Sequence, residues 1–275
     1  MILNGKVIKD KILNELKEKV SNNNLNIGLA IIQIGNDYAS DIYINEKKKM
    51  CDYVGYRFYR YKYECNVIEE DIINKINELN NNDNIHGILV QLPIPKSLDK
   101  DRIINSISID KDIDGLKNNS YFIPCTPLGI LNLIDYYKID VVNKNIVVIG
   151  KSNIVGKPIS ELLIERGSNV VICDSKTNNL SEYTRCADII IIAIGKANFL
   201  TKDMIKDNSI IIDVGINRVD GKLCGDVDFD DVKDKVSMIT PVPGGIGPMT
   251  ISALALNLYK AYELNKKEDE NIWKK

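Results

Sequence analysis

The chain has 275 residues, of which 44% are hydrophobic, enough to bury one large core or two of ordinary size. Its 36 basic and 38 acidic residues are interspersed, so no general field favours nucleic acid or anionic lipid as a partner. No apolar run approaches the roughly 18 residues that a membrane-spanning helix needs. Residues 1–5 do not resemble a signal peptide.

The cysteines and the single histidine limit the possible chemistry. None of the six cysteines forms a Cys-x-x-Cys pair, and most lie in apolar segments, so we expect reduced residues of a cytosolic protein, with no disulfide framework and no metal site. His86 precedes an apolar run and is more typical of the start of a strand than of a catalyst. Acid–base chemistry would therefore depend on lysine, tyrosine or carboxylates.

Periodicity in the first half predicts helices that alternate with buried strands. Helical patterns occupy residues 6–20 and 69–80, and strand-like runs occupy residues 27–34, 56–61 and 85–92. This alternation predicts a parallel sheet that is covered by helices on both faces.

The helix expected after residues 35–37 carries a candidate active site. Ser40 is a suitable N-cap, and a helix that starts there places Tyr43 and Lys47 about one turn apart on one face. An aromatic ring beside a primary amine can stack a flat ligand and move a proton at one place. The alternative is a solvated lysine run with Tyr43 half in the core.

Two further polar residues are candidates for ligand binding, Gln91 at a strand end and Asp114 in an expected turn. Gln91 ends the strand that residues 93–95 stop, at the carboxyl edge where such sheets bind ligands. The alternative is an amide that only tethers a loop. Asp114 precedes Gly115, a pair that often marks a turn, so turn formation is the alternative to ligand binding.

The second half opens with a linker at residues 124–127 and then shows a nucleotide-binding pattern. A strand over residues 145–150, a helix over 157–166 and a strand over 169–174 form a βαβ unit of nearly Rossmann dimensions. Gly150 and Gly156 flank its turn, although Ser152 stands where the middle glycine of the fingerprint would be. We expect strands over residues 188–194, 209–214 and 236–239 to extend the same sheet.

A glycine-rich stretch at residues 240–250 leads into the last helix, expected over residues 251–264. Its glycines allow close backbone approach, and Pro248 suits a first helical turn. Such a loop can bind an anion or an oxygen, or can serve as a hinge between domains. We expect this helix to return to the first domain and the polar residues 265–275 to be frayed.

Several motifs, in order along the chain, together resemble one known family. They are Ala-Ser-x-x-Tyr-x-x-x-Lys-x-Lys at residues 39–49, Gly-Ile-Leu-Val-Gln-Leu-Pro-Ile-Pro at 87–95, Lys-Asp-Ile-Asp-Gly at 111–115, Pro-Cys-Thr-Pro at 124–127, Val-Ile-Gly-Lys-Ser-Asn-Ile-Val-Gly at 148–156, Asp-Val-Gly-Ile-Asn at 213–217, Gly-Asp-Val at 225–227 and Thr-Pro-Val-Pro-Gly-Gly-Ile-Gly-Pro-Met-Thr at 240–250. From about residue 5 to 262, the chain is similar to the bifunctional methylenetetrahydrofolate dehydrogenase/methenyltetrahydrofolate cyclohydrolase family.

The resemblance implies an α/β protein of two domains. A folate-binding catalytic domain would comprise residues 1–122 and 248–275, and a Rossmann-like, doubly wound, mainly parallel domain would comprise residues 123–247. The implied dehydrogenase passes a hydride from 5,10-methylenetetrahydrofolate to NADP, and the implied cyclohydrolase opens the resulting methenyl cation with water to give 10-formyltetrahydrofolate. The family also implies a cytoplasmic homodimer that acts in one-carbon metabolism and purine biosynthesis.

The same resemblance assigns roles to the folate-site candidates. Tyr43 would stack on and orient the folate, Lys47 would transfer the proton, Gln91 would position Lys47, and Asp114 would accept hydrogen bonds from the pterin amino edge. For Lys47 to act as a base its pKa must fall, and burial, the neighbouring Lys48 and Lys49 and a cationic substrate would all lower it. The remaining implied folate contacts are Val90, Leu92, Pro243, Gly244, Gly245, Ile246 and Gly247.

For the cofactor, Gly150, Lys151 and Ser152 match the family's phosphate loop, and Ile216 matches its nicotinamide-side contact. Lys151 and Ser175 could hold a 2′-phosphate, which favours NADP. Asp174 would repel that phosphate and could hold a ribose diol, which favours NAD. The balance favours NADP.

One departure from the family concerns the eight residues between Gly115 and Pro124, where the family usually has a longer loop beside the folate. Its loss could leave a dehydrogenase with weak or absent cyclohydrolase activity. The pattern also admits a two-domain NAD(P) dehydrogenase for a different small substrate, or a non-catalytic nucleotide-binding module.

Overall fold

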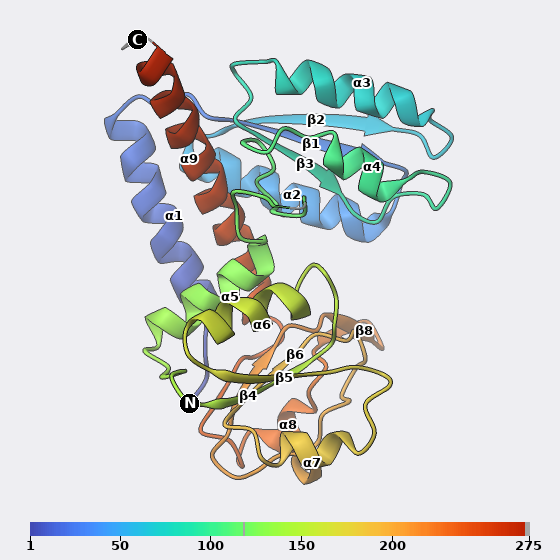
Figure 1. The fold of residues 1–275 in the computed structure, drawn as a ribbon, viewed down its shortest axis with the longest axis vertical. Coiled ribbons are helices and arrows are strands. Elements are labelled where there is room, and N and C mark those ends of the chain that lie inside the picture. Colours follow the sequence, from blue (N-terminus) through green and yellow to red (C-terminus); the bar gives the residue numbers. More distant parts are fainter. Residues whose placement is uncertain (118, 273–275) are drawn as a thin grey trace. The chain divides into compact units, whose positions relative to one another are not determined.

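The computed structural model describes residues 1–117 and 119–272, with side chains described up to residue 266. The chain divides into two compact units (Figure 1). Unit 1 contains Met1–Asp10 and Thr126–Thr250, and unit 2 contains Lys11–Cys125 and the chain from Ile251 onwards. Among the described residues, the helices are too short or too polar to cross a membrane.

Unit 2 is built on a parallel sheet with the strand order β2-β1-β3. The strands are β1 (Gly28–Ile34), β2 (Arg57–Tyr63) and β3 (Gly87–Gln91), which confirms the three expected runs. Helices α3 (Glu69–Asn80) and α4 (Lys100–Asn105) cover one face through a cluster of aliphatic side chains, and α2 (Tyr38–Val54) lies against the other face (Figure 1). Helix α4, a single short helix capped by Asp99, is absent from the sequence-based expectation.

The start of α2 corrects one expectation. The N-cap is Asp37 and not Ser40, because the Asp37 carboxylate accepts hydrogen bonds from the Ser40 backbone N–H at 2.8 Å and from its hydroxyl at 2.9 Å. An aspartate at the N-cap satisfies an N–H group that the first helical turn leaves unpaired. The helix therefore begins earlier, and Ser40 lies within its first turn. Tyr43 and Lys47 keep their helical spacing.

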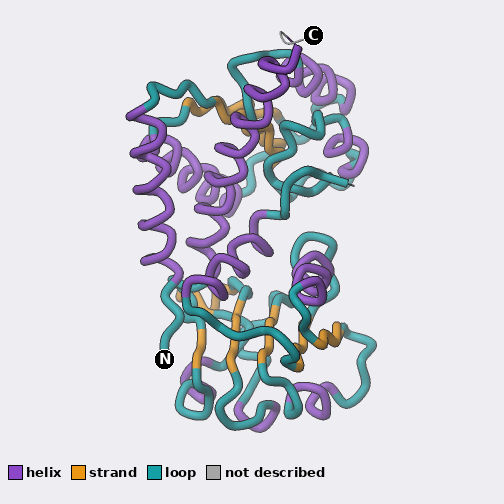
Figure 2. The backbone as a smooth tube through the Cα atoms, turned by 60° about the vertical axis from the view of Figure 1, so that its left-hand side comes forward, coloured by secondary structure: helices purple, strands orange, loops and turns teal. Residues whose placement is uncertain are grey.

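Unit 1 is built on a five-stranded parallel sheet with the order β10-β7-β6-β4-β5. Its strands are β4 (Asn145–Ile149), β5 (Asn169–Cys173), β6 (Ile189–Ile192), β7 (Ile210–Asp213) and β10 (Met238–Ile239). Helices α5 (Cys125–Tyr136) and α6 (Gly156–Glu165) lie on one side of the sheet, and α7 (Leu180–Thr184) and α8 (Phe229–Val232) on the other (Figures 1 and 2). This is the expected doubly wound Rossmann-like sheet, and the strand order reverses between β4 and β6.

Several short elements of unit 1 lie outside the sequence-based expectations. They are α7, α8, the 3₁₀ helix η1 (Lys202–Met204) and the antiparallel hairpin of β8 (Asn217–Val219) and β9 (Lys222–Cys224). Each is three to five residues long, too short for helical or strand periodicity to be detectable.

Both long terminal helices pass from one unit to the other. Helix α1 (Gly5–Asn22) follows residues that hydrogen-bond to unit 1: the Leu3 N–H donates to the Ile239 carbonyl at 2.8 Å and the Gly5 N–H to the Gly244 carbonyl at 2.9 Å. Helix α9 (Ile246–Ile272) starts before and ends after the expected range of 251–264. The prediction of a frayed tail is therefore wrong as far as Ile272, and residues 273–275 lie outside the described chain.

Candidate functional site

Helix α2 and the end of β3 bring Lys47 and Gln91 together in unit 2. Lys47 lies on the buried face of α2 with 9% of its surface exposed, and its Nζ donates to Gln91 Oε1 at 2.9 Å. Gln91 Nε2 donates to the Leu92 carbonyl at 2.8 Å, which fixes the amide with its oxygen towards the amine. Gln91 is therefore oriented by its neighbour and in turn orients Lys47.

The environment of Lys47 makes its amine a better proton acceptor. Burial lowers the pKa of Lys47, while the negative charge of Asp114 and the thiol of Cys125 act in the opposite direction. Lys49, expected to help, forms an ion pair with Glu46 at 2.7 Å instead. Burial, and not repulsion from neighbouring lysines, is thus the main cause of the shift, which increases the fraction of neutral amine.

Asp114 lies in a turn that other residues build. The buried Asp112 carboxylate accepts from the Lys117 N–H at 2.9 Å, and Gly115 adopts a φ of +67°. Lys111 Nζ donates to the carbonyls of Asn80 at 2.7 Å and Asn82 at 3.0 Å, so its charge serves the end of α3. Asp112 and Lys111 therefore stabilise the turn, and Asp114 remains partly exposed.

The other candidates of unit 2 differ in accessibility. Tyr43 is 40% exposed, one turn before Lys47, so its ring can receive a flat ligand, and partial burial raises the pKa of its hydroxyl. The Val90 side chain packs with α3 and α4, on the face of the sheet opposite to α2, so its backbone is the part that can face a ligand on the Lys47 side. Strand residues alternate between faces, which separates Val90 from Gln91.

His86 has a structural role in unit 2. Its Nδ1 accepts from the Gly28 N–H at 3.1 Å, and its ring packs edge-on against Tyr262. Burial lowers the pKa of His86 to about 4, so the imidazole is neutral near pH 7. The histidine joins β1 to the start of β3, as the sequence indicated.

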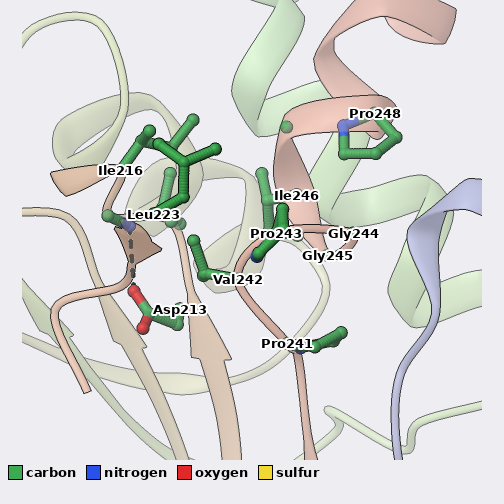
Figure 3. A pocket seen from close by; sticks show the side chains of 13 residues that line it. Asp213, Ile216, Leu223, Pro241, Val242, Pro243, Gly244, Gly245, Ile246 and Pro248 are labelled. Atoms are coloured by element: carbon green, nitrogen blue, oxygen red, sulfur yellow. Dashed lines mark hydrogen bonds between the residues drawn. The ribbon is translucent and has the colours of Figure 1, made fainter. Parts of the chain in front are cut away.

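In unit 1, the glycine-rich loop lines a hollow of about 130 Å³ (Figure 3). Residues 243–247 form one wall, and Ile216, which is 45% exposed, forms part of another. Gly244 adopts a φ of +108°, and a Cβ on Gly245 would lie 2.6 Å from the Pro241 carbonyl oxygen, so the tight loop requires glycine at both positions. The hollow also includes Leu223 of the β8–β9 hairpin.

Two buried carboxylates hold the strand ends beside this hollow. Asp213 accepts from the N–H groups of Gly215, Asp226 and Val227 at 2.9 to 3.0 Å. Asp226 in turn accepts from the N–H groups of residues 194–196 at 2.7 to 3.0 Å. Burial raises the pKa of Asp213 to about 6 despite these donors. The motifs at residues 213–217 and 225–227 therefore form one supporting network.

The loop after β4 lies where the strand order reverses. Gly150 adopts a φ of +115°, and a Cβ on Gly156 would lie 1.8 Å from the Gly150 carbonyl oxygen, so a side chain at Gly156 would open the turn. The Ser152 hydroxyl accepts from the Val155 N–H at 3.1 Å and supports the start of α6. Lys151 and its neighbours up to residue 154 are exposed.

The adjacent strand β5 brings the remaining cofactor candidates to the same edge. The Gly150 N–H donates to the Cys173 carbonyl at 2.8 Å, so the loop that starts at Asp174 lies beside the first loop. The Asp174 carboxylate accepts from the Lys176 N–H at 2.8 Å, while Ser175 is exposed. Asp174 thus stabilises its own turn.

These features define an α/β protein with a Rossmann-like unit and, in its other unit, a buried lysine held by a glutamine. The chain belongs to the tetrahydrofolate dehydrogenase/cyclohydrolase family: the sequence model of the catalytic domain matches residues 3–114, and that of the NAD(P)-binding domain matches residues 124–266. The resemblance and the fold class inferred from the sequence are confirmed.

Individual relatives match over nearly the full chain. The bifunctional protein FolD of Lachnoclostridium phytofermentans is 48% identical, over 94% of this chain and 96% of that protein. The crystal structure of bifunctional FolD from Campylobacter jejuni has a TM-score of 0.94 and 44% identity, with 96% of this chain and 99% of that chain covered. The Trypanosoma brucei enzyme, solved with NADP cofactor and inhibitor, has a TM-score of 0.91 and 29% identity, with 96% and 98% covered.

Proposed function

We propose that the protein oxidises 5,10-methylenetetrahydrofolate with NADP to 5,10-methenyltetrahydrofolate and hydrolyses that product to 10-formyltetrahydrofolate. The observation that carries the hydrolytic half is the buried Lys47 amine, held 2.9 Å from Gln91 and in the field of Asp114. Both domains of the bifunctional family are present, and the similar FolD proteins are bifunctional. A dehydrogenase without cyclohydrolase activity is therefore not favoured.

In the hydrolytic step, Lys47 acts as the proton acceptor. Water adds its oxygen to the methenyl carbon, and the neutral amine takes a proton from that water. The hydroxyl left on this carbon then loses its proton as the bond from the carbon to N5 breaks, N5 takes up a proton, and the carbon becomes the formyl group on N10. The cation and water thus yield the neutral product and one released proton. Gln91 keeps the amine aimed at the reacting carbon.

Substrate orientation falls to the other folate-site residues. We propose that the exposed Tyr43 ring stacks on the folate and that Asp114 pairs with the pterin amino edge. The Leu92 and Val90 backbone would line this site. Hydride transfer needs this orientation but no proton transfer, so Lys47 is dispensable for it in principle.

The loops after β4 and β5 fit a dinucleotide. The backbone N–H groups of residues 151–154 donate to no backbone carbonyl within the described chain, and such groups at a helix start suit phosphate oxygens. Gly150 and Ser152 shape this loop, Lys151 and Ser175 would hold the 2′-phosphate, and Ile216 would flank the nicotinamide. Bound NADP supplies the hydride acceptor. NAD would lack the group that Lys151 and Ser175 recognise.

We propose the further assignments by family likeness. The folate-binding domain would comprise residues 1–122 and 248–275 and the NAD(P)-binding domain residues 123–247, with Met1–Asp10 packed on the latter, as the two compact units suggest. The enzyme would be a cytoplasmic homodimer that supplies one-carbon units for purine biosynthesis. The six cysteines, all within the described chain, are free, as a reducing compartment favours.

One coupled assay tests this function. NADPH formation and methenyl absorbance are followed together after methylenetetrahydrofolate and NADP are added, with NAD as the control. We expect NADPH to appear and the methenyl signal to rise and then decay faster than in an enzyme-free blank. A methenyl signal that decays only at the blank rate would show dehydrogenase activity alone. If no NADPH forms, the dehydrogenase half is refuted, and methenyltetrahydrofolate supplied directly then tests the hydrolytic half.

A further inference from the structure

Helix α9 makes an unusual contact with the loop that carries Asp114. Asn257 of α9 is 3% exposed, and its Nδ2 donates to the Ile113 carbonyl and to the Ile123 carbonyl, both at 2.9 Å. These two carbonyls stand at the two ends of the short loop over residues 114–122. A single buried amide therefore closes the base of this loop.

The loop makes two further contacts that keep it closed. At Gly115, a Cβ would lie 2.7 Å from the Phe122 carbonyl oxygen and from the Pro124 nitrogen, so its two ends lie directly against each other. Lys260, one turn after Asn257 on α9, donates from Nζ to the Tyr121 carbonyl at 3.2 Å. The described part of the loop, which omits residue 118, thus contacts the same helix at several carbonyls.

Cys125 connects this closed base to the candidate catalytic groups. Its Sγ lies 3.8 Å from Asn257 Nδ2 and donates to the Ile113 carbonyl at 3.4 Å. Burial and the charge and hydrogen bond of Asp114 raise the pKa of this thiol well above its ordinary value, and the charge of Lys47 opposes that shift. Asn257 and Cys125 thus both donate to the Ile113 carbonyl, which directly precedes Asp114, and the charges of Asp114 and Cys125 act on Lys47.

We propose that Asn257 is a positioning residue of the reaction, whose amide closes the short loop and thereby holds the Asp114 carboxylate where its charge acts on Lys47. This inference rests on the proposed function and deepens it. Asn257 fixes this short loop at both ends. A clamped short loop keeps the cyclohydrolase arrangement that an unclamped one would lose.

The pH dependence of the cyclohydrolase reaction tests this role. The titratable groups that act on Lys47 are Asp114 and Cys125, and Asp114 favours the protonated amine. If Asn257→Ala releases the loop, the rising limb of kcat/KM against pH should move to lower pH. Asp114→Asn should move it in the same direction, and Asn257→Ala should add no further shift in the Asp114→Asn background. The KM for the folate should rise by about tenfold or more, the change expected when a hydrogen bond to a charged group is lost.

Tyr56→Phe is the matched control. The buried Tyr56 hydroxyl donates at 3.2 Å to the carbonyl of Ala255, which lies on α9 like Asn257. Tyr56→Phe therefore removes a comparable buried hydrogen bond that does not involve the loop over residues 114–122. We expect the pH limb and KM of this control to be unchanged. If Asn257→Ala does not fold, Asn257→Ser keeps one donor on a shorter side chain and should give a smaller shift in the same direction.

The outcomes separate the two proposals. A limb that moves in Asp114→Asn but stays in place in the Asn257 variants would overturn the positioning role and leave the proposed function intact. If Asp114→Asn does not move the rising limb of kcat/KM, then Asp114 does not act on Lys47. The positioning role of Asn257 would then be refuted as well. If the pH shifts of Asn257→Ala and Asp114→Asn simply add in the double variant, the two residues act independently. That result would also overturn the positioning role of Asn257.

Discussion

Replacement of Lys47 by methionine should separate the two reactions. Methionine has nearly the length of lysine and fills the same buried space, but it can neither accept nor donate a proton. Loss of a positioned general base costs about 10²- to 10⁴-fold, so cyclohydrolase kcat should fall by that factor. Hydride transfer involves no proton transfer by this amine and should remain measurable.

The structure indicates that this variant will fold. The substitution leaves Gln91 Oε1 without its donor at 2.9 Å, and a buried acceptor left unpaired costs about 1–3 kcal/mol. Part of that cost is offset, because the buried amine is itself unfavourable, as the lowered pKa of Lys47 indicates. A net loss of about 1–2 kcal/mol leaves most of the usual 5–15 kcal/mol of stability.

The assay supplies each substrate separately. Methenyltetrahydrofolate decay reports the cyclohydrolase after subtraction of the enzyme-free rate, and NADPH formation reports the dehydrogenase. Lys49→Met is the control, since the Lys49–Glu46 pair is exposed and such pairs contribute at most about 1 kcal/mol. Equal losses of both activities in Lys47→Met, with the control intact, would refute the division of labour.

Three other expected outcomes follow from the same geometry. Tyr43→Ala should raise the folate KM in both reactions by about 2- to 12-fold, because stacking on one ring is worth about 0.5–1.5 kcal/mol, and a change in only one reaction would contradict the shared role. Lys151→Ala should lower the ratio of kcat/KM for NADP over NAD by about tenfold, because a hydrogen bond to a charged group is worth about 1.5–3 kcal/mol and exposure weakens it; an unchanged ratio would remove Lys151 from the 2′-phosphate site. Asp213 has a pKa of about 6 against 3.8 when unfolded, so the folded chain binds more protons between these values and its stability falls as the pH rises through them. The difference of about 2 units corresponds to about 3 kcal/mol. The stability of the wild type relative to Asp213→Asn should therefore fall by most of that amount, about 2 kcal/mol, from pH 4 to pH 7 in urea unfolding. A difference independent of pH would show that folding does not raise the pKa of Asp213.

The parts of the fold that could be predicted are those with a long repeating pattern. The buried runs of β1 and β3 and the apolar spacing of α1 and α3 are detectable because many residues contribute to each. The helix α4 and the hairpin β8–β9 have too few residues for a period, and their positions depend on tertiary contacts. The N-cap of α2 differs from the expected one because Asp37 and Ser40 are both good capping residues, and the sequence alone does not show which side chain turns back.

The candidate site was predictable only where a residue's role depends on its own motif. Tyr43 and Lys47 could be found from their helical spacing, and Gln91 from its position at the end of a strand. Asn257 could not, because its partners Ile113 and Ile123 lie 144 and 134 residues away in the chain. Backbone carbonyls as partners leave no sequence signal at all.

The pairing of glycines with buried carboxylates constrains how this chain can change over evolutionary time. A Cβ on Gly225 would lie 1.8 Å from Asp213 Oδ2, and one on Gly215 would lie 2.2 Å from the Asp226 carboxyl carbon. A side chain added at either glycine collides with an aspartate. Replacement of either aspartate by a shorter residue leaves several backbone N–H groups without an acceptor. A lineage can therefore leave this arrangement only by simultaneous replacement at several positions, so drift should leave the four residues fixed while the surrounding surface diverges.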